Sequence, residues 1–117
     1  MVCIQPGNTI GRCIEIAEGT GTQVAMRARR IVNEAILAGC VGVVLAHNHP
    51  SGLAKASNAD YAATAHIANA LNAVDIPLLE HFVFANDRFV ALSEDARFFP
   101  FFGDAYRTIT KTPMMDD

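Results

Sequence analysis

The spacing of hydrophobic and polar residues predicts seven secondary-structure elements. Residues 2–4 are apolar, and a turn with Pro6, Gly7 and Asn8 follows. Residues 10–17 then alternate, with Ile14 and Ile16 on one face, which indicates a half-buried strand. We expect the two apolar segments to pair as a hairpin across the turn.

Two later segments have the three- and four-residue spacing of amphipathic helices. The first covers residues 25–38 and ends at Gly39, a residue typical of helix C-termini. The second covers residues 58–73 and is rich in alanine, a strong helix former. The faces predicted to turn inward are formed by Ala28, Ile31, Val32, Ala35 and Ile36 in the first helix and by Thr64, Ile67, Leu71 and Val74 in the second.

Three apolar runs complete the pattern, at residues 41–45, 78–84 and 88–92, and residues 85–87 form a turn between the last two. The run at 41–45 has no polar position, so we expect a central strand buried on both faces. The predicted order is β-β-α-β-α-β-β. It indicates an α/β fold with a mixed β-sheet flanked by helices.

The stretch of residues 46–61, AHNHPSGLAKASNADY, follows that central strand. His47 and His49 are one residue apart, so in an extended chain both imidazoles point the same way. Ser57 and Asp60 begin the second helix, from which Asp60 can face the histidines. Two imidazoles and a carboxylate suit zinc, and three protein ligands leave a fourth position for water. We therefore predict a catalytic type of zinc site, at the strand end where open α/β sheets bind ligands.

Simpler interpretations exist for parts of this stretch. Ser57 and Asp60 have the spacing of a capping box, which needs no metal. Two surface histidines would explain His47 and His49 on their own. Ser57 can also serve both as a cap and as a part of the site.

Length and composition indicate one globular domain, because the 117 residues are 51% hydrophobic and 18% charged. The net charge of −3 provides no general attraction for nucleic acid. No apolar run is long enough to span a membrane, and the start does not resemble a signal peptide. The spacing of Cys3, Cys13 and Cys40 fits no zinc or redox motif, so we expect free thiols and a cytoplasmic protein.

Other polar residues have less specific interpretations. His66 is expected at the surface, and His81, in an apolar strand, is expected to make a structural hydrogen bond near the site. One basic cluster contains Arg27, Arg29 and Arg30. We expect it to form a solvated helix face, and the alternative is weak contact with phosphate groups.

The domain is expected to end near residue 97, and residues 98–117 to form a partly disordered aromatic tail. Four phenylalanines lie around Pro100. We expect them to cover an open edge of the domain, and the alternative is a homo-oligomer or partner contact.

The pattern His-x-His, seven residues, Ser-x-x-Asp resembles the JAMM/MPN+ metalloprotease motif, and HNHPSG after an apolar strand is similar to the RadC family. IPLLEH at residues 76–81 matches a segment where that family has Asp-His. The resemblance covers roughly residues 2–95 and implies a JAB/MPN, cytidine-deaminase-like fold. It also implies zinc ligation by His47, His49 and Asp60, with Ser57 beside the metal-bound water.

Two features of the family are missing from the sequence. Larger RadC proteins carry a helix-hairpin-helix domain ahead of this one. JAMM enzymes also use a glutamate on the first strand as general acid/base, and it would fall upstream of Met1. The chain is therefore interpreted as a fragment, a short form or an inactive relative. Glu15 and Glu18 are the nearest substitutes, although surface carboxylates are the default interpretation.

The resemblance implies a zinc-dependent hydrolase that cleaves peptide or isopeptide bonds of a protein substrate. The alternative is a non-catalytic metal-binding or interaction domain associated with DNA repair. The three arginines alone do not form a DNA-recognition surface.

Overall fold

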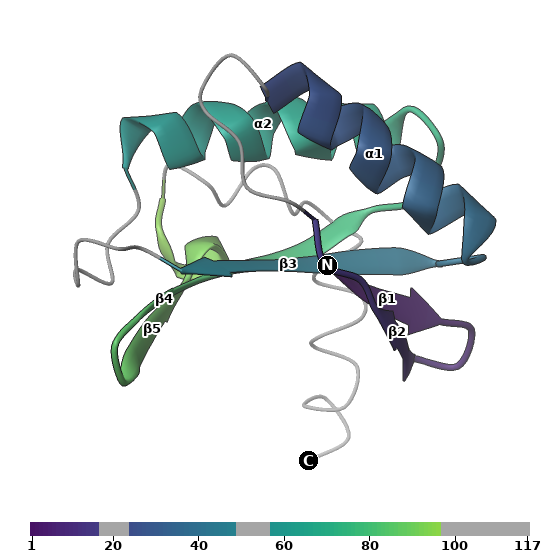
Figure 1. Cartoon of the computed structure of the whole chain (residues 1–117), viewed down its shortest axis with the longest axis horizontal. Coiled ribbons are helices and arrows are strands. Elements are labelled where there is room, and N and C mark those ends of the chain that lie inside the picture. The colour runs from purple at the N-terminus through teal and green to yellow at the C-terminus, as the bar shows by residue number, and fades with distance from the viewer. Residues whose placement is uncertain (17–23, 49–56, 97–117) are drawn as a thin grey trace.

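The computed structural model describes residues 1–16, 24–48 and 57–96 (Figure 1). Within them the chain forms five strands, two helices and a short 3₁₀ helix in the predicted order β-β-α-β-α-β-β. The elements are β1 Val2–Gln5, β2 Thr9–Cys13, α1 Val24–Leu37, β3 Gly42–Asn48, α2 Asn58–Asn72, β4 Leu78–Ala85, β5 Arg88–Ala91 and η2 Leu92–Glu94.

The strands form one mixed sheet in the order β2-β1-β3-β4-β5, so β3 is central as predicted. β1 pairs antiparallel with both β2 and β3, and β4 pairs antiparallel with β5. β3 and β4 are parallel neighbours joined through α2, because parallel strands need a crossover connection. The two hairpin turns contain Asn8 and Asn86 at positive φ (60° and 56°), a conformation that asparagine tolerates better than most residues.

Both helices cover the same face of the sheet (Figure 1). The hydrophobic core lies between this face and the helices. Most of the predicted inward positions are buried. Ile36 is an exception at 53% exposed, because the buried stripe of α1 is Ala28, Ile31 and Ala35. Ile36 instead lines a groove between the two helices that is open to solvent. Val74 is 37% exposed because α2 ends two residues before it.

The predicted ends of two strands were wrong. β2 stops at Cys13 rather than at residue 17. β3 begins at Gly42 and continues to Asn48, three residues beyond the predicted end, because it stays paired with β4 as far as Asn48 opposite Phe84. His47 therefore lies within the central strand, in line with Leu45, and not in the loop after it.

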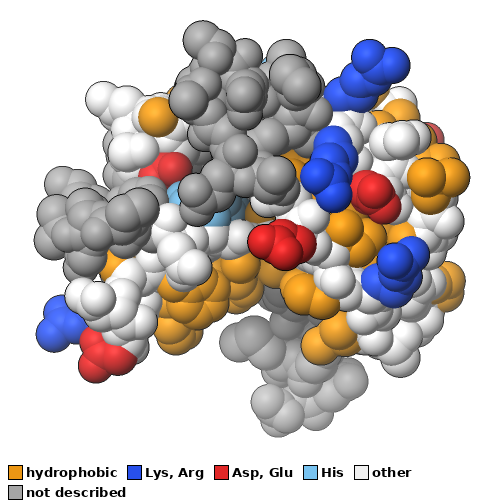
Figure 2. Space-filling model, viewed as in Figure 1, with side chains coloured by type: hydrophobic (Ala, Val, Ile, Leu, Met, Phe, Trp, Pro, Cys, Tyr) orange, Lys and Arg blue, Asp and Glu red, His pale blue; other side chains and the backbone are white. Residues whose placement is uncertain are grey.

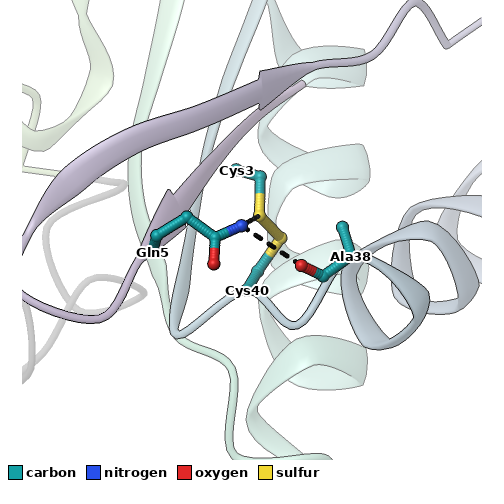
Figure 3. The surroundings of a disulfide bond; sticks show 4 residues. All are labelled: Cys3, Gln5, Ala38 and Cys40. Carbon is teal, nitrogen blue, oxygen red and sulfur yellow. Dashed lines mark hydrogen bonds between the residues drawn. A yellow bond between two sulfur atoms is a disulfide. The ribbon is translucent and has the colours of Figure 1, made fainter.

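The expectation of three free thiols was also wrong. Cys3 of β1 and Cys40, just before β3, form a disulfide (Figure 3), and Cys13 is free and exposed. The Gln5 side-chain amide donates to the carbonyl of Ala38 at 3.1 Å and contacts the Cys3 sulfur at 3.3 Å. Cysteine usage therefore no longer supports a reducing compartment for this chain.

The opposite face of the sheet has no helix over it in the described part of the chain. Phe82 and Phe84 point to this face, since their neighbours in β4 point toward the helices. Their rings lie 5.8 and 5.7 Å from that of Phe89 on β5, and Phe89 is 60% exposed. Hydrophobic side chains gather on this side of the molecule in Figure 2. Neither described helix has the length and apolar character needed to cross a membrane.

Candidate functional site

The site is built where the carboxyl end of β3 meets the start of α2. The Nε2 atom of His47 lies 3.1 Å from Oδ1 of Asp60. His47 is on the helix-facing side of the sheet, and Asp60 is in the first turn of the helix above it. The two side chains are 32% and 14% exposed, so the pair is sheltered but reachable from solvent.

The start of α2 is fixed by the predicted capping box. Ser57 is the N-cap, its Oγ accepts a hydrogen bond from the Asp60 backbone N–H at 3.1 Å, and Asp60 Oδ2 accepts one from the Ser57 backbone N–H at 2.8 Å. One carboxylate oxygen thus holds the helix end while the other faces His47. The capping and site interpretations of Asp60 are compatible, because the cap uses Oδ2 and the contact with His47 uses Oδ1.

A second histidine lies behind His47. Nε2 of His81, on β4, is 2.8 Å from Nδ1 of His47, and Nδ1 of His81 is 2.8 Å from Oγ1 of Thr64 on α2. His81 is 6% exposed and Thr64 fully buried. The prediction of a structural hydrogen bond for His81 is confirmed. Thr64 was expected only as a core residue; its partner could not be found from sequence, because it lies 17 residues away on another element.

Glu80 fixes the backbone beside His81. Its Oε1 accepts hydrogen bonds from the backbone N–H groups of His81 and Ser93, each at 3.0 Å. Its Oε2 accepts a further bond from the Ser93 hydroxyl. This buried carboxylate therefore links β4 to η2 and fixes the position of the His81 backbone.

A cavity of about 150 Å³ opens beside these residues. His47, Asp60 and His81 line one part of it, and the remainder is mainly apolar: Met1, Ile16, Ile31, Leu45, Ala46, Ala63 and Ile67. Burial lowers the pKa of the Met1 α-amino group, which donates to the Ile14 carbonyl at 2.8 Å. Figure 2 shows histidine at the surface on the side of the molecule that faces the viewer.

His49, the third predicted ligand, lies outside the described residues. Among the residues that are described, no group of three His, Cys, Asp or Glu side chains is arranged to hold a metal. The donor pair that is described does fit zinc. Ligand atoms about 2.0 Å from a tetrahedral zinc lie about 3.3 Å apart, close to the 3.1 Å between His47 Nε2 and Asp60 Oδ1.

The remaining candidate residues lie away from this pair. His66 is exposed on α2, as predicted, and the side chains of Arg29 and Arg30 are exposed on α1. Glu15 is also exposed, and its backbone carbonyl accepts from Arg30 at 3.2 Å. It does not line the cavity beside His47. Glu18, the Arg27 side chain and the aromatic tail at residues 98–117 lie outside the described positions.

The mixed sheet packed with helices agrees with the fold that the JAMM-like motif implied, and His47 and Asp60 of that motif lie side by side at the carboxyl end of its central strand. The family model of the RadC-like JAB domain matches residues 1–97. The chain belongs to this family, which confirms the resemblance.

Curated relatives carry the name UPF0758 protein. One from Bordetella parapertussis is 43% identical over 81 residues, which is 69% of this chain and 36% of that protein. Another from Cupriavidus taiwanensis is 31% identical over 97 residues, 83% of this chain and 42% of that protein. The chain therefore matches less than half the length of these relatives.

Proposed function

We propose that this domain is a zinc-dependent hydrolase of the JAMM type that acts on a peptide or isopeptide amide bond. The observation that carries the proposal is the approach of His47 Nε2 to Asp60 Oδ1 at 3.1 Å, beside a cavity at the end of the central strand. Membership of the RadC-like JAB family supports the same assignment. His49 is the third ligand in this proposal.

Each described residue has a distinct task in the proposed site. His47 and Asp60 would hold the ion, which would supply Lewis-acid polarisation of a carbonyl and a water-derived nucleophile at neutral pH. Ser57 accepts a backbone bond through Oγ, so its hydroxyl proton remains able to donate toward a developing oxyanion. The apolar side of the cavity offers a surface against which the apolar parts of a substrate can pack.

A second candidate function is a metal-binding interaction domain without hydrolytic activity. The observation in its favour is that no glutamate is among the residues lining the cavity in the described part of the chain. A missing general acid/base costs about 10²- to 10⁴-fold in rate, while leaving the ion's ligands intact. Binding and hydrolysis must therefore be measured separately.

Metal binding is tested by zinc content and by competition with a chromophoric chelator. We expect about one zinc per wild-type chain. His49→Ala and Asp60→Asn should each weaken zinc binding by more than about 100-fold, beyond the effect of losing an outer hydrogen-bond partner. Asparagine keeps an oxygen for the cap of α2, so this variant separates ligation from helix capping. His66→Ala, an exposed histidine on the same helix, is the matched control.

Equal zinc affinity in wild type, His49→Ala and His66→Ala would rule the site out. Hydrolysis is then tested on the zinc-loaded chain with a fluorogenic peptide library and an isopeptide-linked pair. Turnover that is lost in Asp60→Asn favours the enzyme. Zinc binding at full stoichiometry with no turnover favours the interaction domain.

A further inference from the structure

Four side chains from three elements form one continuous line of contacts. Thr64 Oγ1 lies 2.8 Å from His81 Nδ1, His81 Nε2 lies 2.8 Å from His47 Nδ1, and His47 Nε2 lies 3.1 Å from Asp60 Oδ1. The two rings have centroids 4.8 Å apart and are tilted by 58°. This arrangement joins them through their nitrogen atoms and not through stacked faces.

We propose that His81 and Thr64 are positioning residues whose hydrogen bonds are coupled to the tautomer of His47, so that both histidines change tautomer together when a metal ion binds. A neutral imidazole carries one proton, so each ring has one donor and one acceptor nitrogen. A hydrogen bond between the two rings needs a single proton between His47 Nδ1 and His81 Nε2. The state of one ring therefore determines the state of the other.

Without an ion, His47 Nε2 lies 3.1 Å from the negative Oδ1 of Asp60, a close contact that is not aligned as a hydrogen bond, and the nearby negative charge favours a proton on that nitrogen. His47 Nδ1 is then an acceptor and receives the Nε2 proton of His81. His81 Nδ1 is in turn an acceptor and receives the hydroxyl proton of Thr64. Both rings carry their proton on Nε2 in this state.

With an ion on His47 Nε2, that atom must offer a lone pair. The proton of His47 is then on Nδ1 and is donated to His81 Nε2. His81 carries its own proton on Nδ1 and donates it to Thr64 Oγ1. Both rings carry their proton on Nδ1, and the direction of each bond is reversed. The proton of His81 Nε2 passes to His47 Nδ1, the proton displaced from His47 Nε2 leaves to bulk water, and His81 Nδ1 takes up one proton from bulk water, so each ring stays neutral.

Thr64 suits the end of this line because a hydroxyl is both donor and acceptor and can reverse its role without moving. When it accepts from His81, a helical threonine can give its own proton to the carbonyl four residues earlier, here Asp60. Thr64 is 0% exposed and His81 is 6% exposed, so water competes little for these bonds. Partners of this kind typically change metal affinity by about 10- to 100-fold.

This inference rests on the proposed zinc site, and the test separates the two. The tautomers are read from long-range ¹H–¹⁵N correlation spectra of the histidine rings, in a buffer where free imidazole is neutral. In metal-free wild type we expect Nε2 protonation on both His47 and His81. After one equivalent of zinc we expect Nδ1 protonation on both. Thr64→Val is nearly isosteric and removes the hydroxyl, and Thr64→Ser restores it.

We expect Thr64→Val to weaken zinc binding by about 10- to 100-fold, and Thr64→Ser to stay within about threefold of wild type. Zinc binding with unchanged or opposite tautomers of the two rings would overturn the relay and leave the proposed metal site intact. Absence of zinc binding would overturn the metal-driven change together with the proposed function. His81→Phe, which removes both ring nitrogens, takes away the partner of His47 Nδ1 and should shift the ¹⁵N resonance of that atom; an unchanged His47 spectrum in that variant also overturns the relay.

Discussion

Breaking the disulfide between Cys3 and Cys40 should cost the domain a large part of its stability. The bond joins the first strand to the residue before the central strand, across a sequence separation of 37 residues. Both cysteines are buried, at 0% and 7% exposure. Opening the bond raises the conformational entropy of the unfolded chain, because its loop is no longer closed, while the packing of the folded state can stay largely the same.

The loop length sets the expected size of the effect. The chain-entropy relation for a loop of this length gives about 4 kcal/mol at 25 °C. Removal of native disulfides from small domains typically costs 2–5 kcal/mol, which brackets that value. With a urea m-value of about 2 kcal/mol/M, the unfolding midpoint should fall by about 2 M. The total stability of a domain is only about 5–15 kcal/mol, so a loss of about 4 kcal/mol removes a large share of it.

The measurement uses the Cys13→Ser variant, in which Cys3 and Cys40 are the remaining cysteines of the chain. Urea unfolding is followed by circular dichroism in the oxidised form and in excess reductant. Cys13 is exposed and free, so the substitution itself should change the free energy of unfolding by less than about 0.5 kcal/mol. Coincident midpoints with and without reductant would refute the reasoning. So would alkylation of both remaining thiols in the denatured but unreduced protein.

Three further predictions concern the packing that positions the site. Leu71→Ala should lower the free energy of unfolding by about 2–5 kcal/mol, because Leu71 is 0% exposed. Leu37→Ala, at a position 75% exposed, should lower it by less than about 1 kcal/mol, and equal effects in urea unfolding would contradict the core assignment. Ser57→Ala should cost about 1 kcal/mol through the lost cap, and Ser57→Gly only a few tenths, as measured by thermal melts; a neutral alanine variant would remove the capping role. Gly42→Ala should lower the free energy of unfolding by about 1–3 kcal/mol, because the new Cβ would lie 2.6 Å from a methyl group of buried Leu79. An equally stable variant with unchanged amide resonances in β3 would contradict this close approach.

The order of elements could be predicted from sequence because each signal is local. The spacing of apolar residues indicated two helices, and the polar stretch after residues 41–45 indicated the place of the site. The capping box was visible for the same reason, since Ser57 and Asp60 are three residues apart on one helix. Such patterns depend on the periodicity of a single element and need no knowledge of its neighbours.

Only the tertiary structure decided which residues meet across elements. β3 extends to Asn48 because β4 pairs with it there, which places His47 in the sheet. His81 and Thr64 meet because the crossover through α2 lays the helix over β4, and Cys3 meets Cys40 because β1 pairs beside the start of β3. The sequence determined the side-chain types at the candidate site, two imidazoles and a carboxylate. The fold determined their partners, since contacts between distant residues depend on packing and are absent from local patterns.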